Sequence, residues 1–313
     1  MADKINLNFY CYPRKGALDD FRRVADRINA STSDVRARVL PTTLHPSRLV
    51  GTVASAFDPT LSIEMDRLKR LKPFRGRRFQ HIRMGKDEEM ARLAAAGIPV
   101  PRWVKLEPGV ALDAGEWGPY IVVKPSNGRR GAFVWVHRTG KVRYKPPEDF
   151  PEGHPGRDGL LAQQFVYTGE WPVAYRVLTY LGRPVAACRY DGRRDMAPLR
   201  SSAGFKDSGG RSIVANAMGC AITLTQDPEI LDMSRRVHAT FPDVPSLGID
   251  FIRDANSGQI YVLEVNPMGD SWFLSSDAGR SMQAQFNLDL HSQFGALDVI
   301  YDASLEAARR HAI

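Results

Sequence analysis

The chain has 313 residues, of which 43% are hydrophobic and 25% charged, the balance of an ordinary globular protein with a core of enzyme size. The three cysteines, Cys11, Cys188 and Cys220, have no Cys-x-x-Cys spacing, which argues against a disulfide scaffold or a zinc site and favours a reducing cytoplasm. No stretch approaches the ~18 apolar residues that span a bilayer, and Met1–Tyr10 lacks a signal-peptide pattern, so we expect a cytoplasmic protein with no membrane partner.

The formal net charge is +8, and much of it comes from a run of Lys and Arg residues between Arg67 and Arg83. Such a run most often forms a solvated helix face and loop. It would also attract an anionic ligand such as ATP, or nucleic acid. Phe74 and Phe79 are the only Phe, Tyr or Trp residues of the run that could stack on bases, so we expect no nucleic-acid partner.

The first part of the chain, to about Arg83, predicts a small α/β lobe. A short apolar run, Ile5–Tyr12, indicates a strand. A helix should follow, because apolar residues then recur at helical spacing, at Leu18, Phe21, Val24, Ala25 and Ile28. We expect a second helix at roughly 60–71, which would place four apolar residues on one face: Leu61, Met65, Leu68 and Leu71.

Between residues 87 and 136 the pattern changes from helix to strand. Residues 87–96 predict a helix, which Gly97 is well placed to end. Tyr120–Lys124 and Phe133–Val136 then indicate two strands joined by a polar loop that contains glycine.

The remainder of the chain predicts mainly strands. A helix is expected near 228–240, and another from Asp289 onwards. The strand-like runs are Leu160–Val166, Val173–Tyr180, Val185–Tyr190, Ser246–Arg253 and Ile260–Val265. The total is an α+β fold with a large, mainly antiparallel component.

Two of these strands place oxygen ligands on one face of a β-hairpin. Residues 248–253 and 259–266 are separated by Asp-Ala-Asn-Ser-Gly, a turn composition, so we expect them to pair. Glu264 and Asn266 are two residues apart and share a sheet face. If Arg253 pairs with Gln259, Asp250 lies on that same face and diagonal to Glu264, within about 7–8 Å.

The oxygen atoms gathered in this way suit a magnesium ion. Asp250 and Glu264 stand in apolar runs, where an unpaired charge would be costly. Mg²⁺ binds one or two carboxylates and completes its octahedron with substrate phosphates and water. We therefore predict Asp250, Glu264 and Asn266 as metal ligands; the alternative is that both carboxylates are surface residues of the hairpin.

A lysine and a glycine-bearing loop predict a phosphate-binding segment. Lys124 ends the strand Tyr-Ile-Val-Val-Lys, and Gly128 and Gly131 follow in a loop whose backbone N–H groups could approach a phosphate. The spacing is not that of a Walker A loop. Asn127-Gly128 is also an ordinary hairpin turn, so the loop alone leaves both interpretations open.

In this order the residues resemble those of the ATP-grasp superfamily, over roughly Lys86 to Asp277. A lysine precedes a helix that ends in Ala-Gly-Ile-Pro-Val-Pro, and a strand ending in Val-Val-Lys-Pro leads into the glycine loop. A Leu-Leu-Ala-Gln-Gln-Phe-Val strand and a final Gly-Ile-Asp and Val-Leu-Glu-Val-Asn-Pro pair complete the series. The chain looks most like the carboxylate–amine ligases of the glutathione synthetase and ribosomal-protein glutamate-ligase type.

The resemblance implies an ATP-grasp fold, in which ATP lies between two lobes with antiparallel sheets. It implies an N-terminal α/β lobe over residues 1–83, a central lid over 84–160 and a C-terminal lobe with the metal site over 161–313. The N-terminal lobe of such enzymes shapes substrate choice, and closure of the lid would exclude water from the reaction. A homodimer is common among the look-alikes and is a further expectation.

The resemblance also implies roles for the residues that match its motifs. Lys86, Lys124 and the glycine loop would contact the phosphates of ATP. The adenine would be recognised, mostly through backbone groups, by a hinge made of Gln163, Gln164, Phe165 and Val166. Asp250, Glu264 and Asn266 would hold the cofactor Mg²⁺, or Mn²⁺ in its place.

Two arginines are implied as catalytic residues. Arg176, in Val-Ala-Tyr-Arg-Val, resembles the arginine of the family motif Asp-Ile-Arg-Val, although Ala174 stands at the acidic position. Arg200 resembles the arginine beside the acylphosphate site, although Ser202 stands where an asparagine is expected. Gln164 replaces a frequent glutamate, so ribose recognition should differ.

The implied reaction joins a substrate carboxylate to an amine at the expense of ATP. The carboxylate attacks the γ-phosphate to give an acylphosphate, and the amine then displaces phosphate. We expect Asp270, Ser271 and Trp272 to border the pocket for small-molecule or peptide substrates, because they follow the metal ligands directly. Trp272 is equally compatible with packing.

Three alternatives stay open. An ATP-dependent phosphotransferase of the same fold would pass phosphate to a hydroxyl or another acceptor without forming an amide. A non-catalytic nucleotide-binding module is disfavoured, because the lysines and the metal ligands are intact. A basic nucleic-acid-binding protein would bind with strong salt dependence and without Mg²⁺-ATP.

Overall fold

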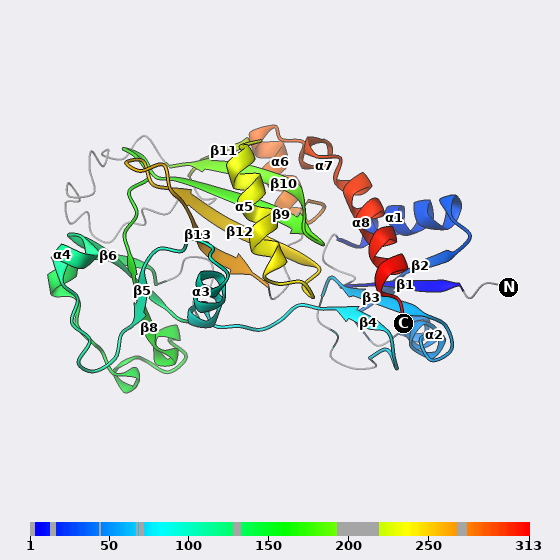
Figure 1. The fold of residues 1–313 in the computed structure, drawn as a ribbon, viewed down its shortest axis with the longest axis horizontal. Coiled ribbons are helices and arrows are strands. Elements are labelled where there is room, and N and C mark those ends of the chain that lie inside the picture. The colour runs from blue at the N-terminus through cyan, green and yellow to red at the C-terminus, as the bar shows by residue number, and fades with distance from the viewer. Residues whose placement is uncertain are drawn as a thin grey trace.

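The computed structural model describes residues 4–12, 17–43, 45–66, 68, 72–127, 133–192, 219–267 and 274–313. Within these residues the chain forms three sheets, one parallel and two antiparallel (Figure 1). No helix in the described part is both long enough and apolar enough to cross a membrane.

The N-terminal sheet is parallel, and its first strand and first helix are as predicted. Its strands are β1 (Ile5–Cys11), β2 (Val35–Pro41), β3 (Thr60–Glu64) and β4 (Arg77–Phe79), in the order β2-β1-β3-β4. Its helices are α1 (Ala17–Ser31) and α2 (Pro46–Ala54). Phe9 of β1 and Phe21 of α1 are fully buried, with ring centroids 5.2 Å apart. The helix and the sheet therefore share an apolar core.

The helix expected at 60–71 is wrong where the structure describes it, because Thr60–Glu64 forms the strand β3. All five residues of β3 are buried, and the strand pairs with β1 on one side and β4 on the other. Leu61 and Ile63 alternate with polar residues, which is the period of a strand, and of the four apolar residues on which the helix was predicted only Leu61 lies in β3. Residues 67 and 69–71 lie outside the described part. β2 and α2 were not predicted from the sequence.

The central sheet is antiparallel and has a core of its own. Its strands are β5 (Trp103–Lys105), β6 (Tyr120–Pro125), β7 (Trp135–Arg138) and β8 (Leu160–Gln164), in the order β5-β8-β6-β7. The short helix α4 (Ala114–Trp117) and three single turns at 139–141, 147–149 and 155–158 complete it. Its core consists of Leu106, Trp117, Ile121, Val123, Phe150, Leu160 and Ala162. β8 crosses the expected lobe boundary at residue 160 and pairs with β6 along its length.

The largest sheet is antiparallel and has five strands in the order β11-β10-β9-β12-β13. They are β9 (Val173–Tyr180), β10 (Arg183–Asp191), β11 (Ala221–Leu224), β12 (Ser246–Arg253) and β13 (Ile260–Asn266). The helix α5 (Pro228–Ala239) covers one face, where Val237 packs with Val177 and Ile249. The four runs predicted as strands between Val173 and Val265 are therefore confirmed, as is the helix near 228–240.

The opposite face of the large sheet packs against the N-terminal lobe and the C-terminal helices. These are α6 (Asp277–Phe286), α7 (Leu290–Gln293) and α8 (Ala296–His311). Tyr180 at the end of β9 donates to or accepts from Ser304 of α8 at 2.8 Å, and its ring centroid lies 5.8 Å from that of Phe21. The N-terminal lobe, α8 and the large sheet thus share one core, whereas the central sheet does not join it.

One helix, α3 (Lys86–Ala95), lies between the central sheet and the edge strand β13 (Figure 1). As predicted, Gly97 follows it in a left-handed conformation, with φ of +70°. Leu93 of α3 packs in the apolar cluster of α5 and the large sheet. The helix therefore belongs structurally to the large sheet, and it presents its first turn to the central sheet.

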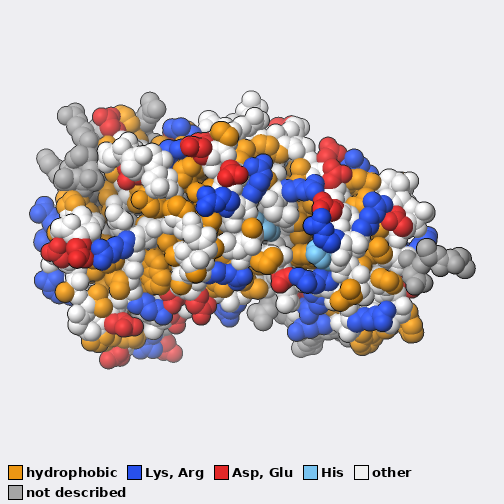
Figure 2. All heavy atoms as spheres, in the orientation of Figure 1, with side chains coloured by type: hydrophobic (Ala, Val, Ile, Leu, Met, Phe, Trp, Pro, Cys, Tyr) orange, Lys and Arg blue, Asp and Glu red, His pale blue; other side chains and the backbone are white. Residues whose placement is uncertain are grey.

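Charged side chains are interspersed over the described residues of the face shown in Figure 2. Lys and Arg lie next to Asp and Glu there and do not gather into one basic surface of the kind that a nucleic-acid backbone contacts.

Candidate nucleotide and metal site

The hairpin of β12 and β13 forms as predicted, but the predicted register is wrong. Arg253 pairs with Ile260 and not with Gln259. If the register of Arg253 with Ile260 continued unchanged, Leu263 would lie opposite Asp250. A β-bulge between Asp250 and Phe251 shifts the register, so that Asp250 lies directly opposite Glu264. Side chains directly opposite each other share a face and are closer than a diagonal pair. The two carboxylates therefore come together more closely than expected.

The row that begins with these carboxylates continues across the sheet. Asp250 is the register partner of Arg176 on β9, and Arg176 is the partner of Cys188 on β10. Arg176 donates two parallel hydrogen bonds, from Nε to Oδ1 of Asp250 at 2.6 Å and from Nη2 to Oδ2 at 2.7 Å. The negative charge of Asp250 raises the pKa of Arg176, so the guanidinium stays charged. The structure thus brings an arginine predicted as catalytic onto a predicted metal ligand.

The first turn of α3 brings a lysine to the other carboxylate. Nζ of Lys86 donates to Oε2 of Glu264 at 3.1 Å, and the Lys86 side chain is 12% exposed. Asn266, two residues further along β13, donates its amide N–H to the carbonyl of Gly248 at 3.3 Å. That bond uses the nitrogen of the amide and leaves its oxygen as an acceptor for other groups. The structure therefore brings Lys86 to the strand that carries Glu264 and Asn266.

The second predicted phosphate lysine is buried on the central sheet. Lys124 is 6% exposed, and its Nζ donates to Oε1 of Gln163 at 2.8 Å. The pKa of Lys124 is lowered to about 8, mainly by burial and in part by the positive charge of Lys86. Both predicted phosphate lysines therefore lie close enough for their charges to interact.

The expected adenine hinge begins with a residue whose side chain is already engaged. Gln163, 2% exposed, accepts from Lys124 and donates to Sδ of Met90 at 3.3 Å. The N–H of Gln164 donates to the carbonyl of Arg102 at 2.8 Å, in line with the pairing of β8 and β5. Phe165 and Val166 then lead out of the central sheet, and Val166 packs in the core shared by the large sheet and the N-terminal lobe. Gln163–Val166 thus spans the end of β8 and the start of the segment 165–172 that leads to β9 of the large sheet.

Glu89 is a charged residue of this region that the sequence analysis missed. It is 4% exposed, and its Oε1 accepts a hydrogen bond from the backbone N–H of Val265. Burial raises the pKa of Glu89 to about 8, and the nearby charge of Glu264 also raises it. A signal was present in the sequence: Lys86, Glu89 and Met90 follow one another at the i, i+3 and i+4 spacing of one helix face, which Leu93 continues.

The structure brings together most of the predicted site, but not all of it falls in the described part. The residues brought together are Lys86, Lys124, Gln163, Arg176, Asp250, Glu264 and Asn266. The predicted residues Gly128, Gly131, Arg200, Asp270, Ser271 and Trp272 lie outside the described residues.

The donor atoms on the hairpin fit a hard cation. Two carboxylates and one amide oxygen are too few to enclose an ion, and Mg²⁺ completes such a set with phosphate oxygens and water. The contacts from Arg176 and Lys86 leave further lone pairs on Asp250 and Glu264, because a carboxylate accepts about four hydrogen bonds. Over the described residues, no three His, Cys, Asp or Glu side chains form a cluster that could hold a metal. The donors present therefore fit Mg²⁺ bound together with a nucleotide.

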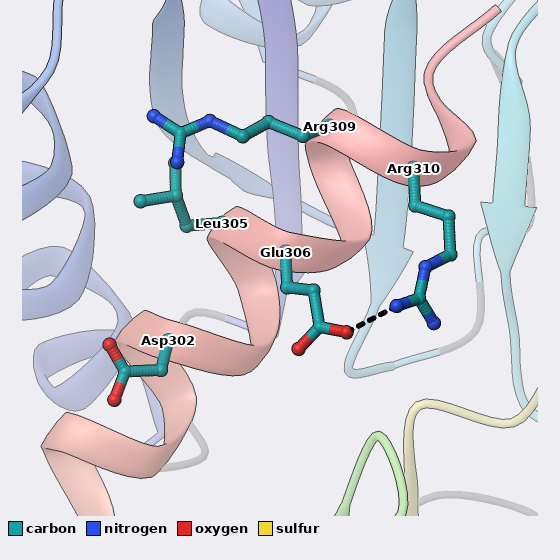
Figure 3. Close-up of a pocket in the computed structure, with 5 residues that line it drawn as sticks. All are labelled: Asp302, Leu305, Glu306, Arg309 and Arg310. Carbon is teal, nitrogen blue, oxygen red and sulfur yellow. Dashed lines mark hydrogen bonds and ion pairs between the residues drawn. The ribbon is translucent and has the colours of Figure 1, made fainter.

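A surface hollow of about 480 Å³ lies elsewhere, on α8 (Figure 3). Glu306 pairs there with Arg310 at 2.6 Å, and Arg309 pairs with Asp34 at 2.9 Å. Its lining residues are Asp302, Leu305, Glu306, Arg309 and Arg310. None of them belongs to the predicted site, and the paired charges give no sign of a nucleotide site.

By sequence, no family model and no curated protein matches the chain. By structure, the chain is similar to ATP-grasp ligases. The ATP-grasp ligase PsnB complexed with a minimal precursor has a TM-score of 0.50 at 16% identity, over 98% of this chain and 99% of that one. The D-alanine–D-alanine ligase of Bacillus anthracis has a TM-score of 0.49 at 14% identity, over 99% of both chains. D-cycloserine synthetase DcsG has a TM-score of 0.47 at 15% identity, over 90% of this chain and 99% of that one.

The similarity to PsnB, together with the three sheets, confirms the predicted α+β class and the resemblance to ATP-grasp ligases at the level of the fold. An identity of 16% shows a likeness of fold and does not identify the reaction.

Proposed function

We propose that the protein is an ATP- and Mg²⁺-dependent ligase that activates a substrate carboxylate as an acylphosphate and joins it to an amine. The observation that carries the proposal is the contact of Lys86 with Glu264 at 3.1 Å, because it joins the expected phosphate-binding residues to the expected metal ligands. Lys124 lies close enough for its pKa to respond to both of these residues. A site in which two lysines lie beside carboxylates suits a triphosphate with its metal ion, because the lysines can bind phosphate oxygens and the carboxylates can bind the ion.

Each charged side chain has a role in this reaction. Lys86 and Lys124 neutralise the phosphates of ATP as the bond to the γ-phosphorus breaks. Asp250, Glu264 and Asn266 hold Mg²⁺, which supplies positive charge to the phosphate oxygens. Arg176 keeps Asp250 in a fixed orientation through two hydrogen bonds. No nucleophile of the protein is needed, because the substrate carboxylate itself attacks the phosphorus.

The arrangement of the sheets supports a lid over residues 84–160 that closes on ATP. The central sheet has a separate core, so it can move as a unit relative to the large sheet, and Gln163–Val166 is the connection about which it would turn. α3 falls inside the expected range of the lid but packs with the large sheet, so it would stay with that sheet, and the central sheet would be the part that moves. Closure would bring Lys124 towards Lys86 and exclude water that would hydrolyse an acylphosphate.

The substrates belong to the classes that such a site accepts, namely a small-molecule or peptide carboxylate and an amine. The PsnB structure contains a precursor peptide, whereas the two other relatives are named for reactions of small amino acids or their analogues. The N-terminal lobe over residues 1–83 would contribute to the choice between them. As the resemblance implies, Arg200 would lie beside the acylphosphate, and Asp270, Ser271 and Trp272 would border the substrate pocket.

An ADP-release screen tests the proposal. Candidate carboxylates and amines are supplied in pairs with Mg²⁺-ATP, and the products are identified by mass spectrometry; neutral hydroxylamine added without the amine should trap the acylphosphate as a hydroxamate. The ligase should release one ADP and one phosphate for each amide formed. The double variant Asp250→Asn/Glu264→Gln should lose this activity, and normal ADP release by that variant would refute the metal site. A phosphorylated acceptor formed without free phosphate would instead identify a phosphotransferase.

A further inference from the structure

The strand that carries two of the proposed metal ligands is an edge strand. β13 pairs with β12 on one side, and on its other side backbone groups are met by the segment that contains α3. Val262 donates its N–H to the carbonyl of Pro99 at 2.9 Å, and the carbonyl of Pro267 accepts from the N–H of Ile82 at 2.9 Å. Between these two backbone contacts, the N–H of Val265 donates to the carboxyl of Glu89. At Val265, the carboxyl side chain of Glu89 therefore accepts the backbone N–H that a further strand would accept at this edge of the sheet.

The position of that contact is set by the geometry of helix and strand. Lys86 and Glu89 lie one turn apart on the same face of α3. Their side chains contact consecutive residues of β13, Lys86 the carboxylate of Glu264 and Glu89 the N–H of Val265. Because Val265 stands between Glu264 and Asn266, the helix holds the strand between two proposed metal ligands.

A carboxyl in this place costs free energy that an apolar side chain would not. Glu89 is 4% exposed, and an uncompensated buried carboxyl is unfavourable. The neighbouring inward residues of α3, Met90 and Leu93, are apolar and fully buried, so helix packing alone does not call for an acid. The amide of Val265 needs an acceptor, and Glu89 supplies one in either protonation state of its carboxyl.

We propose that Glu89 is a positioning residue of the metal site. By accepting the N–H of Val265, it fixes the segment Glu264–Asn266 so that both side chains point at one ion, and it fixes Lys86 against that segment. Glu89 contacts neither the nucleotide nor the ion. The inference rests on the proposed function of the site and adds to it a residue on which metal affinity depends.

The test compares variants that keep or remove the acceptor oxygen. Glu89→Gln keeps an oxygen at the same distance along the side chain, and Glu89→Leu removes it at similar volume. Glu64→Leu is the matched control, because Glu64 is a carboxyl of 1% exposure in the N-terminal sheet, paired with Arg78. Calorimetry gives the Kd of ADP with Mg²⁺ and the Kd of ADP in EDTA. The Kd in EDTA divided by the Kd with Mg²⁺ measures the contribution of the metal to binding.

We expect Glu89→Leu to lower this ratio about 10-fold, as loss of a group that orients a metal ligand does. The Kd of ADP in EDTA should stay close to that of the unchanged protein. Glu89→Gln should retain the ratio, and Glu64→Leu should leave it unchanged even if it lowers stability. Hydrogen exchange at the amide of Val265 should accelerate in Glu89→Leu and not in Glu89→Gln.

Two failures are distinguishable. If the unchanged protein binds ADP no better with Mg²⁺ than in EDTA, the proposed metal site and function fail. If it does bind better and Glu89→Leu keeps the full ratio, or weakens ADP equally in EDTA, the positioning role of Glu89 is overturned while the proposed function stands. Should Glu89→Leu not fold, Glu89→Asp decides in its place, because it withdraws the acceptor by one methylene and keeps an acid: a retained ratio would again overturn the inference.

Discussion

Asp250 and Glu264 lie directly opposite each other on β12 and β13. A single β-bulge shifts the register between Asp250 and Phe251; without it, Leu263 would lie opposite Asp250. Two carboxylates on adjacent strands repel each other unless positive charge lies between or beside them. Arg176 and Lys86 supply part of that charge in the protein itself. A bound divalent ion would supply the rest.

Magnesium should therefore stabilise the protein in the presence of nucleotide. At Mg²⁺-ADP about 100-fold above its Kd, the free energy of unfolding should exceed that of the protein without nucleotide by about 2.7 kcal/mol, and the increase with ADP in the absence of Mg²⁺ should be smaller. Asp250→Asn should show a much smaller increase, because the ion loses one charged ligand. Thermal unfolding with ADP, with and without Mg²⁺, measures the difference. Asp191→Asn, in the same sheet, serves as control; an equal response of both variants would speak against Asp250 as a ligand.

Arg176 should matter through its geometry as well as its charge. Arg176→Lys keeps a cation but cannot form two parallel hydrogen bonds to Asp250, so we expect the affinity for Mg²⁺-ADP to fall by about 10-fold. The matched control is Arg189→Lys on the next strand: Arg189 pairs with Asp191, and its side chain is 43% exposed against 42% for Arg176. Calorimetric titration of both variants would reveal the contrast, and wild-type affinity in Arg176→Lys would exclude the orienting role.

The affinity for ATP should fall as pH rises through about 8. Burial lowers the pKa of Lys124 to about 8, so its charge is present below that pH and is lost above it, whereas an exposed lysine stays charged to about pH 10.4. Burial also raises the pKa of Glu89 to about 8, and its ionisation over the same range repels the phosphates.

The Kd of Mg²⁺-ATP measured between about pH 7 and pH 9 checks this. Lys124→Met should bind more weakly at neutral pH and show a smaller pH step, with the remainder due to Glu89. Lys141→Met removes an exposed lysine and should follow the unchanged protein. A Lys124→Met curve parallel to that of the unchanged protein would contradict the assignment.

Acid should destabilise the fold through His238 of α5. His238 is 3% exposed and bonds with Thr179 at 2.7 Å and the carbonyl of Val244 at 3.0 Å. Burial lowers the pKa of His238 from 6.5 to about 4, so the unfolded chain binds the proton first. The free energy of unfolding should therefore fall by up to about 3 kcal/mol as pH drops from 6.5 to 4.

Urea unfolding of His238→Gln over that range tests this. Near neutral pH the variant should be less stable, because the buried ring of His238 and its hydrogen bonds to Thr179 and Val244 are lost. As the pH falls, the variant should lose less stability than the unchanged protein. His137→Gln, which changes an exposed histidine, should keep the full acid dependence. If both variants gave the same pH slope as the unchanged protein, another group would be responsible.

The hairpin and the shared face of its proposed ligands Glu264 and Asn266 could be predicted from the sequence because they depend on local rules. A turn composition joins two apolar runs, and the two-residue period of a strand puts Glu264 and Asn266 on one face. The bulge that sets Asp250 opposite Glu264 could not be predicted, because it depends on how β13 fits β12 and β9 as a whole.

The errors and omissions have tertiary causes. The helix at 60–71 was predicted from the spacing of Leu61 with three apolar residues that follow β3, whereas the pairing of Thr60–Glu64 with β1 and β4, which the sequence does not show, makes this segment a strand. Glu89 looked like one of three acids in the first turn of α3, and only the packing of α3 on β13 buries it. The bond of Gln163 to Lys124 joins neighbouring strands that are far apart in sequence.

Calorimetric titration of the protein with ATP in the presence of Mg²⁺ tests the central claim most directly, since it needs no knowledge of the carboxylate or the amine. We predict saturable binding that weakens in EDTA, weakens in Lys86→Met and Lys124→Met, and loses its dependence on Mg²⁺ in Asp250→Asn/Glu264→Gln. Absence of binding by the unchanged protein, or Mg²⁺-dependent binding that survives intact in the double variant, would contradict it.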